Sequence, residues 1–206
     1  MTTEQSPGWR RLDSRLVHDG RMRVVRHGVQ LPTGERIDFE VDESVPAAAA
    51  TLVLDGADVL LTRQFRYPIG RTILDLPGGG VEPGESPESA ARREMIEEIG
   101  RIPLDLVPLH RYFANPGRAR WAVHLFFCTA TAGTRAGDGP DTGSTTTERG
   151  ATAGTEPSEQ VQLARVPLVE LDDMITTGQI VDPSLLVARL MAAATGRLPA
   201  VGTRLT

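Results

Sequence analysis

One segment, residues 79–100, constrains this chain most, because it crowds carboxylates onto a short predicted helix. It opens with a glycine-rich turn and a Ser-Pro pair, which is typical of a helix start. On a helix over 86–99, Glu94 and Glu98 lie one turn apart on the same face, and Glu97 lies beside them. Like charges at this spacing cost a helix about 0.2–0.5 kcal/mol per pair. A purely structural helix would therefore gain nothing from the pattern.

A bound divalent cation would reverse the sign of this repulsion. The cluster offers carboxylate oxygens and has no adjacent His or Cys, so Mg²⁺ or Mn²⁺ suits it better than zinc. Each glutamate taken singly is explained as well by a solvated helix face. The metal prediction therefore depends on the crowding and not on any one residue.

Composition limits the other possibilities. The 206 residues suit one domain with an extension, or one domain with a small second lobe. A net charge of −5 argues against a general nucleic-acid binder. All 22 basic residues are Arg, so any phosphate clamp must be made of guanidinium groups.

The only cysteine, Cys128, lies in an apolar run and is expected to be a buried strand residue in a reducing compartment, with no disulfide possible. No secretory signal or membrane-spanning run is recognised, so a cytoplasmic location without a membrane partner is expected.

Hydrophobic periodicity predicts an α+β fold, a mixed sheet with helices on its faces. The expected N-terminal β extension occupies residues 1–45, and the main domain occupies 46–206 with a flexible loop at about 131–158. The triple glycine at 78–80 is interpreted as a turn. Two strands are expected within 16–41, around a turn at 31–34, and two more at 47–54 and 59–65 as a hairpin. Further strands are expected at 104–113, 121–130 and 160–166. Further helices are expected at 167–177 and 183–194.

The carboxylate segment resembles the Nudix box, G-x5-E-x7-R-E-U-x-E-E-x-G-U with U aliphatic. One position departs, because Arg101 stands where the last aliphatic residue is expected, although Ile102 can fill that slot. The resemblance implies a Nudix-type α/β/α sandwich. The residues in register are Gly79, Glu85, Arg93, Glu94, Met95, Glu97, Glu98 and Gly100.

A wider resemblance, over residues 9–194, points to the ADP-ribose and nucleoside-diphosphate-sugar pyrophosphatases. It is carried by the runs at 63–68 and 74–79 and by Pro116. It implies cleavage of a nucleotide-sugar diphosphate, most simply ADP-ribose to AMP and ribose 5-phosphate. GDP-mannose, another nucleotide diphosphate, or a non-catalytic nucleotide-sugar sensor remain alternatives.

Departures from that subgroup bear on the substrate. Gly78 and Asp75 replace the Ala and Glu that are common there, and Arg118 and Arg120 place two positive charges where acidic or hydroxyl residues are common. These arginines are candidate substrate-binding residues. These departures therefore leave the identity of the substrate's sugar open.

By resemblance, Glu94 and Glu98 bind Mg²⁺ directly, Glu97 binds a second ion or its waters, and the Gly78 carbonyl completes the shell. Glu97 and Glu98 thus count among the catalytic candidates. Four box positions are expected to be structural: Gly79, Glu85, Arg93 and Gly100. Of these, Glu85 and Arg93 are expected to form an ion pair that holds the loop against the helix.

Arg66 is the candidate for the diphosphate, with a plain surface arginine as the alternative. Glu159 matches the water-activating base best, and Glu156 is next. In the resembled subgroup the N-terminal strands associate with a second subunit, which implies a homodimer. The alternative is that residues 10–44 fold back on their own domain.

Overall fold

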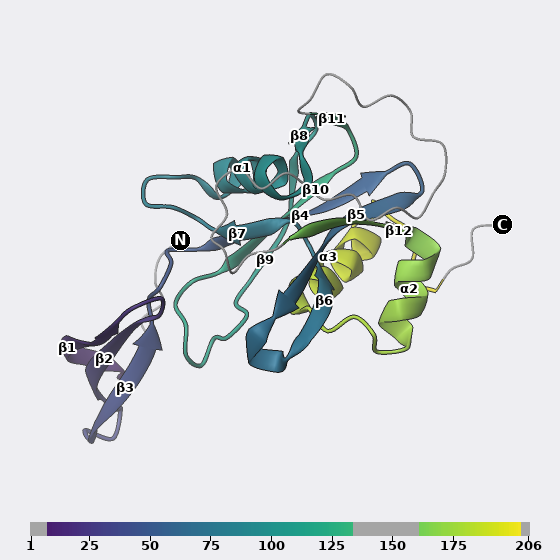
Figure 1. The fold of residues 1–206 in the computed structure, drawn as a ribbon. Coiled ribbons are helices and arrows are strands. Elements are labelled where there is room, and N and C mark those ends of the chain that lie inside the picture. The colour runs from purple at the N-terminus through teal and green to yellow at the C-terminus, as the bar shows by residue number, and fades with distance from the viewer. Residues whose placement is uncertain (1–7, 134–160, 203–206) are drawn as a thin grey trace. The chain divides into compact units, whose positions relative to one another are not determined.

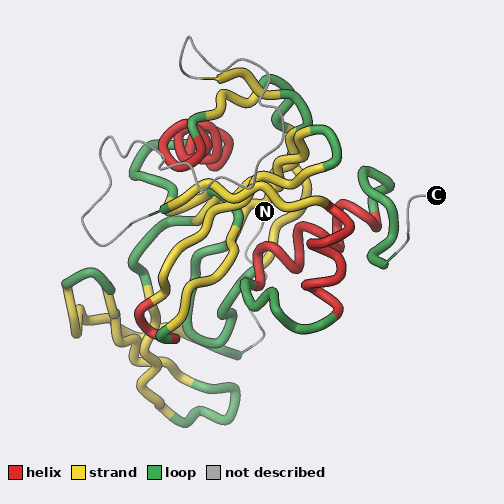
Figure 2. The backbone as a smooth tube through the Cα atoms, turned by 45° about the vertical axis from the view of Figure 1, so that its right-hand side comes forward, coloured by secondary structure: helices red, strands yellow, loops and turns green. Residues whose placement is uncertain are grey.

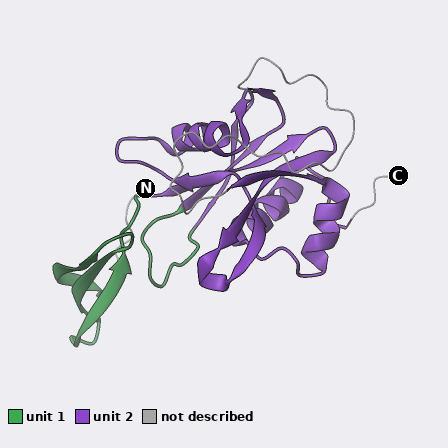
Figure 3. Cartoon of the chain, viewed as in Figure 1, with its two compact units in different colours: residues 1–46, 113–122 green, residues 47–112, 123–206 purple. Residues whose placement is uncertain are grey.

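The computed structural model describes residues 8–133 and 161–202. They form two compact units: residues 1–46 with 113–122, and residues 47–112 with 123–206 (Figure 3). Each unit is described separately below.

The first unit is an antiparallel sheet of three strands in the order β1-β2-β3. They are β1 (Arg10–Asp19), β2 (Arg23–Gln30) and β3 (Arg36–Asp42). The prediction of two strands within 16–41 is wrong in number, because a turn at 20–22, closed by the Gly20 amide on the Met22 carbonyl, divides the first one. The segment 113–122 joins this unit where the Asp42 amide donates to the Arg118 carbonyl at 2.7 Å.

The second unit is built on a seven-stranded mixed sheet. Its main path is β12-β5-β4-β10-β9, with β6 paired to β5 and β7 paired to β4; the β4–β10 pair is parallel. The predicted central hairpin is confirmed, because β4 and β5 meet at the Asp55–Asp58 pair. The strands are β4 (Ala48–Asp55), β5 (Asp58–Arg66), β6 (Arg71–Asp75), β7 (Gly78–Gly80), β9 (Val107–Tyr112), β10 (Val123–Cys128) and β12 (Gln162–Pro167), and η1 (Tyr67–Ile69) is a short 3-10 turn.

Helices cover both faces of this sheet (Figures 1 and 2). α1 (Pro87–Ile99) packs on one face, and α2 (Leu168–Thr176) and α3 (Pro183–Ala194) pack on the other. The expected α/β/α sandwich with a mixed sheet is therefore confirmed. No helix in the described ranges is long and apolar enough to cross a membrane.

The core beneath α1 explains the position of that helix. Ala91, Met95 and Ile99, which are spaced one helical turn apart and form an apolar stripe on α1, are buried against Val53 and Phe126 of the sheet. Cys128 is buried in a strand, as expected. Because this stripe faces the sheet, Glu88 and Glu97 on other sides of α1 remain exposed.

Two local expectations are wrong. Gly78–Gly80 is a strand paired with residues 48–50 and not a turn, because three residues without side chains can lie flat against β4. Residues 131–133, expected to begin a loop, form β11 (Thr131–Gly133) in a two-stranded sheet with β8 (Arg101–Pro103). The rest of the predicted 131–158 loop lies outside the described residues.

Candidate active site

The site is built on α1, which begins and ends as its sequence predicts. The Ser86 hydroxyl accepts a hydrogen bond from the Ser89 amide at 3.0 Å, which caps the helix N-terminus. Gly100 ends the helix in the left-handed conformation with φ 64°, which a residue with a side chain rarely adopts. These signals fix the register of the helix and hence the face that carries its glutamates.

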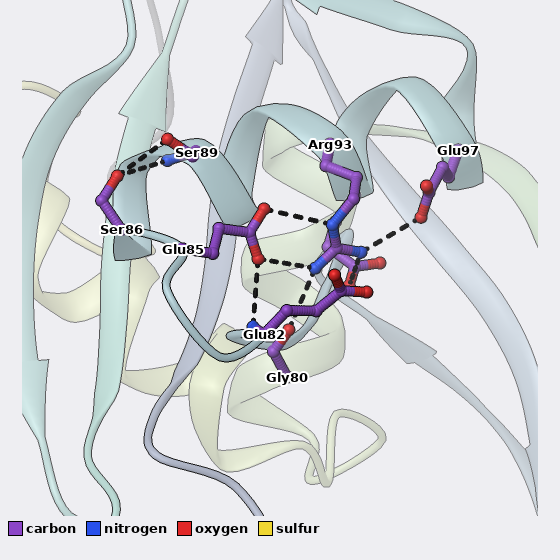
Figure 4. Close-up of polar contacts among 8 residues, drawn as sticks. Gly80, Glu82, Glu85, Ser86, Ser89, Arg93 and Glu97 are labelled. Atoms are coloured by element: carbon purple, nitrogen blue, oxygen red, sulfur yellow. Dashed lines mark hydrogen bonds and ion pairs between the residues drawn. The ribbon is translucent and has the colours of Figure 1, made fainter.

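Arg93 binds three carboxylates, two on α1 and one, Glu85, in the preceding loop (Figure 4). Its Nε and Nη2 donate to the two oxygens of Glu85 at 3.2 and 3.1 Å, and Nη2 also donates to the Gly80 carbonyl at 3.0 Å. Its Nη1 donates to Glu94 at 2.7 Å and to Glu97 at 3.2 Å. We call Arg93 with these four partners the Arg93 centre.

The electrostatics of this centre follow from one cation meeting three carboxylates. The hydrogen bond from Arg93 lowers the pKa of Glu85, and the same bond raises the pKa of Arg93. The expected Glu85–Arg93 ion pair is therefore present, and it fastens the loop after β7 to α1. The contacts of Arg93 with Glu94 and Glu97 were not predicted.

Glu98 points inward to β7. Its Oε2 accepts a hydrogen bond from the Gly78 amide at 2.7 Å. Burial raises the pKa of the Glu98 carboxyl to about 8; the nearby charges of Glu94 and Asp75 also raise it, and the Gly78 amide and Arg66 act in the opposite direction. Without a cation, the buried Glu98 carboxyl therefore favours its protonated, uncharged form.

The absence of side chains at two glycines allows this close packing. A Cβ atom at Gly78 would collide with the Ala49 carbonyl and with Ala50, and one at Gly79 would collide with the Glu94 carboxylate. At Gly78 the obstacle is backbone, so β7 can lie this close to β4 only with glycine there, whereas at Gly79 a side chain would have to displace the Glu94 carboxylate. The glycine strand and the glutamates form one packed unit.

The chemistry of these side chains fits a hard divalent cation. Glu94 and Glu98 offer carboxylate oxygens beside Gly79 and Gly78 of β7, and a bound cation would favour the ionised form of Glu98. Among residues 8–133 and 161–202, however, no group of three His, Cys, Asp or Glu side chains is already arranged around a common ion position. Glu94 and Glu97 are instead engaged with Arg93.

A second polar cluster in the same unit was only partly foreseen. Arg66, at the end of β5, donates through Nη2 to Asp75 Oδ2 at the end of β6, and Asp75 Oδ1 accepts from the Leu76 amide at 2.9 Å. Asp182 caps α3 by accepting from the Leu185 amide at 2.7 Å and is hydrogen-bonded to Asp75. Sequence reasoning missed Asp182, although the Asp-Pro pair at the start of α3 marks a helix cap.

The remaining predicted residues belong to the first compact unit or lie outside the described residues. Arg118 and Arg120 belong to the first compact unit, where Arg118 is exposed and Arg120 forms a 3.0 Å ion pair with Glu43. Glu159 and Glu156 lie outside the described residues.

Residues 44–175 match the NUDIX domain family, which covers more than half of the chain. The chain belongs to this family. The Nudix resemblance of residues 79–100 is thereby confirmed, and α1 with the preceding glycine strand is the Nudix box of this protein.

Known Nudix relatives include the ADP-ribose pyrophosphatase of Bacillus subtilis (strain 168), which is 37% identical over 48% of this chain and 53% of its own length. The match thus spans about half of that relative. The GDP-mannose pyrophosphatase of Enterobacter sp. (strain 638) is 26% identical over 81% of this chain and 84% of its own. A solved structure described as an ADP compounds hydrolase superposes with a TM-score of 0.64 at 20% identity, covering 93% of this chain and 97% of the other, which supports the fold alone.

Proposed function

We propose that this Nudix protein hydrolyses the diphosphate bond of a nucleoside-diphosphate sugar, most simply ADP-ribose to AMP and ribose 5-phosphate, with Mg²⁺ and, alternatively, Mn²⁺. The observation that carries the proposal is the complete carboxylate set of α1, with Glu98 bound to the Gly78 amide of β7. Membership of the Nudix family and the ADP-ribose pyrophosphatase relative support the same reaction.

Glu94, Glu98 and the Gly78 carbonyl are the proposed direct ligands of the ion, and Glu97 is proposed for a second ion or its waters. When bound, Mg²⁺ supplies neutralising charge to the phosphate oxygens and makes a coordinated water more acidic. Arg93 holds Glu94 and Glu97 beside this position and fastens the loop through Glu85. Ionising the buried Glu98 carboxyl costs free energy, and the bound ion would offset this cost.

Arg66 is the proposed contact for the diphosphate. Its side chain is 43% exposed although one nitrogen is bound to Asp75, so part of the side chain is accessible to a ligand. We propose Glu159 as the base that activates water, with Glu156 as the alternative, and Arg118 and Arg120 as further substrate contacts. The first compact unit would have to bring these two arginines to the substrate.

GDP-mannose is the second candidate substrate. The Enterobacter relative matches over most of both chains, whereas the ADP-ribose pyrophosphatase match covers about half of each. A non-catalytic nucleotide-sugar sensor is the third candidate, and the complete box carboxylates speak against it.

We also propose a cytoplasmic homodimer. β1 is exposed along its whole length and presents the apolar side chains of Leu12, Leu16 and Val17, as a surface made for a second copy would. If residues 10–44 instead fold back on their own domain, the protein will be a monomer in sedimentation experiments. The single buried thiol, Cys128, is compatible with a reducing compartment.

A substrate panel tests the function. Purified protein with Mg²⁺ or Mn²⁺ is offered ADP-ribose, GDP-mannose and other nucleotide sugars, and the products are separated by chromatography. We expect AMP and ribose 5-phosphate from ADP-ribose, and a loss of turnover on the order of 10²–10³-fold in Glu98→Gln.

Glu88→Gln is the matched control, because Glu88 lies on the same helix and pairs outward with Arg92. It should keep wild-type turnover. Cleavage of GDP-mannose alone would move the assignment to the second candidate, and calorimetric binding without product would indicate a sensor. No turnover of any compound with either ion would contradict the proposed hydrolysis.

A further inference from the structure

The cluster of Arg66, Asp75 and Asp182 joins three separate elements of the second unit. Arg66 ends β5, Asp75 ends β6, and Asp182 begins α3. None of these contacts belongs to the Nudix box, which lies on β7 and α1. The cluster nevertheless adjoins the box electrostatically, because Asp75 and Arg66 both act on the pKa of Glu98.

Asp75 is held rigidly. Its side chain is only 11% exposed, and its two oxygens accept from the Leu76 amide and from the Arg66 guanidinium. Because an arginine on a strand end has many rotamers, the fixed carboxylate determines where the guanidinium points. The orientation of Arg66 therefore depends on what fixes Asp75.

Asp182 is the group that meets Asp75 from the opposite element. It caps α3 through the Leu185 amide, and the same carboxyl is hydrogen-bonded to Asp75. Burial, together with the neighbouring Asp75 charge, raises the pKa of Asp182 to about 7. Two carboxyls in contact are compatible when one of them carries the proton, so protonated Asp182 can donate to Asp75.

We propose that Asp182 is a positioning residue, whose carboxyl links the first turn of α3 to Asp75 and thereby holds the Arg66 guanidinium in the orientation that meets the substrate diphosphate. This inference rests on the proposed role of Arg66. Capping of α3 alone would not require the contact between Asp182 and Asp75. The link and the cap are two separable roles of one side chain.

Two substitutions separate them. Serine caps helices about as well as aspartate but is too short to serve Leu185 and Asp75 together. Asparagine also caps, and its amide can donate to Asp75 as a protonated carboxyl does. Asp182→Ser should therefore keep the thermal midpoint of wild type and raise KM for ADP-ribose about tenfold with little change in kcat. Asp182→Asn should restore KM to within about twofold of wild type.

A second measurement does not depend on the substrate. The side-chain Nε–Hε signal of Arg66 in a ¹⁵N-correlated NMR spectrum, assigned with Arg66→Lys, reports the environment of the guanidinium. We expect it to move in Asp182→Ser and to stay near its wild-type position in Asp182→Asn. An Arg66 signal that is unchanged in Asp182→Ser overturns the positioning role, as does an unchanged KM.

The two proposals fail in different ways. A wild-type protein that cleaves no nucleotide sugar removes the proposed function, while the NMR signal of Arg66 still decides whether Asp182 positions that side chain. Normal wild-type turnover, with Asp182→Ser and Asp182→Asn equal in KM and in the NMR spectrum, removes only the positioning role.

Discussion

Two arginines of the second unit are bound to carboxylates in opposite ways. Arg189 of α3 has a side chain that is 1% exposed, and its Nε and Nη2 donate to the two oxygens of Asp172 in α2, each at 2.7 Å. Its Nη1 donates to the Pro199 carbonyl at 2.9 Å. Arg93 is 26% exposed and shares its donors among three carboxylates and one carbonyl.

The difference separates a structural ion pair from a site that can take a ligand. Around Arg189 one cation meets one anion, and Asp172 Oδ2 also accepts from the Gly202 amide at 3.3 Å, so the charges balance without a further ligand. In the Arg93 centre the carboxylates outnumber the cation, so a bound metal ion can take over carboxylate oxygens without leaving a buried charge unpaired. The first arrangement stabilises the packing of α2 and α3, and the second is suited to ion binding.

The largest effect is expected at the buried pair. Arg189→Met should lower the free energy of unfolding by about 3–5 kcal/mol, because it leaves the Asp172 carboxylate buried without a counterion. Urea denaturation followed by circular dichroism measures this. The double variant Arg189→Met/Asp172→Leu should recover much of the loss, since no unpaired charge remains.

A small effect of Arg189→Met, under about 1 kcal/mol, would contradict the structural assignment. Equal losses in the single and double variants would show that packing volume and not charge is the cause.

A smaller loss is expected at the Arg93 centre. Arg93→Met removes charge-assisted hydrogen bonds that water can partly replace, so the free energy of unfolding should fall by about 1.5–3 kcal/mol. Arg93→Lys keeps the charge but cannot bind Glu85 through two nitrogens, and it should lie between wild type and Arg93→Met. If Arg93→Met is destabilised as much as Arg189→Met, the comparison between the two centres is wrong.

The sequence predicted the local half of this comparison. The helix over 86–99, its buried stripe and the Glu85–Arg93 pair all lie within one short segment, where helical periodicity and capping residues determine which side chains meet. The Glu88–Arg92 pair on the outer face of α1 is equally local, because its two residues lie one helical turn apart.

The non-local half could not be predicted. Arg189 meets Asp172 only because α2 and α3 pack against each other, and Asp182 meets Asp75 only because α3 begins beside the end of β6. Neither contact has a periodic signal in the sequence. The glycine strand at 78–80 was mistaken for a turn because glycine marks both a turn and the close approach of two backbones, and only the sheet distinguishes them.

The smallest effect concerns the dependence of the Arg93 centre on pH. Because Arg93 lowers the pKa of Glu85 below its usual 4.5, this pair stabilises the folded protein fully above that pH and ceases to do so as the pH falls through the lowered pKa. At pH 7, Glu85→Gln should lower the free energy of unfolding by about 0.5–1 kcal/mol. The gap between wild type and Glu85→Gln should narrow steadily as denaturation is repeated from pH 6 down to about pH 3, once both proteins carry an uncharged residue 85. A gap that stays constant over this range would mean that Glu85 acts through packing, and that its charge contributes little to folding.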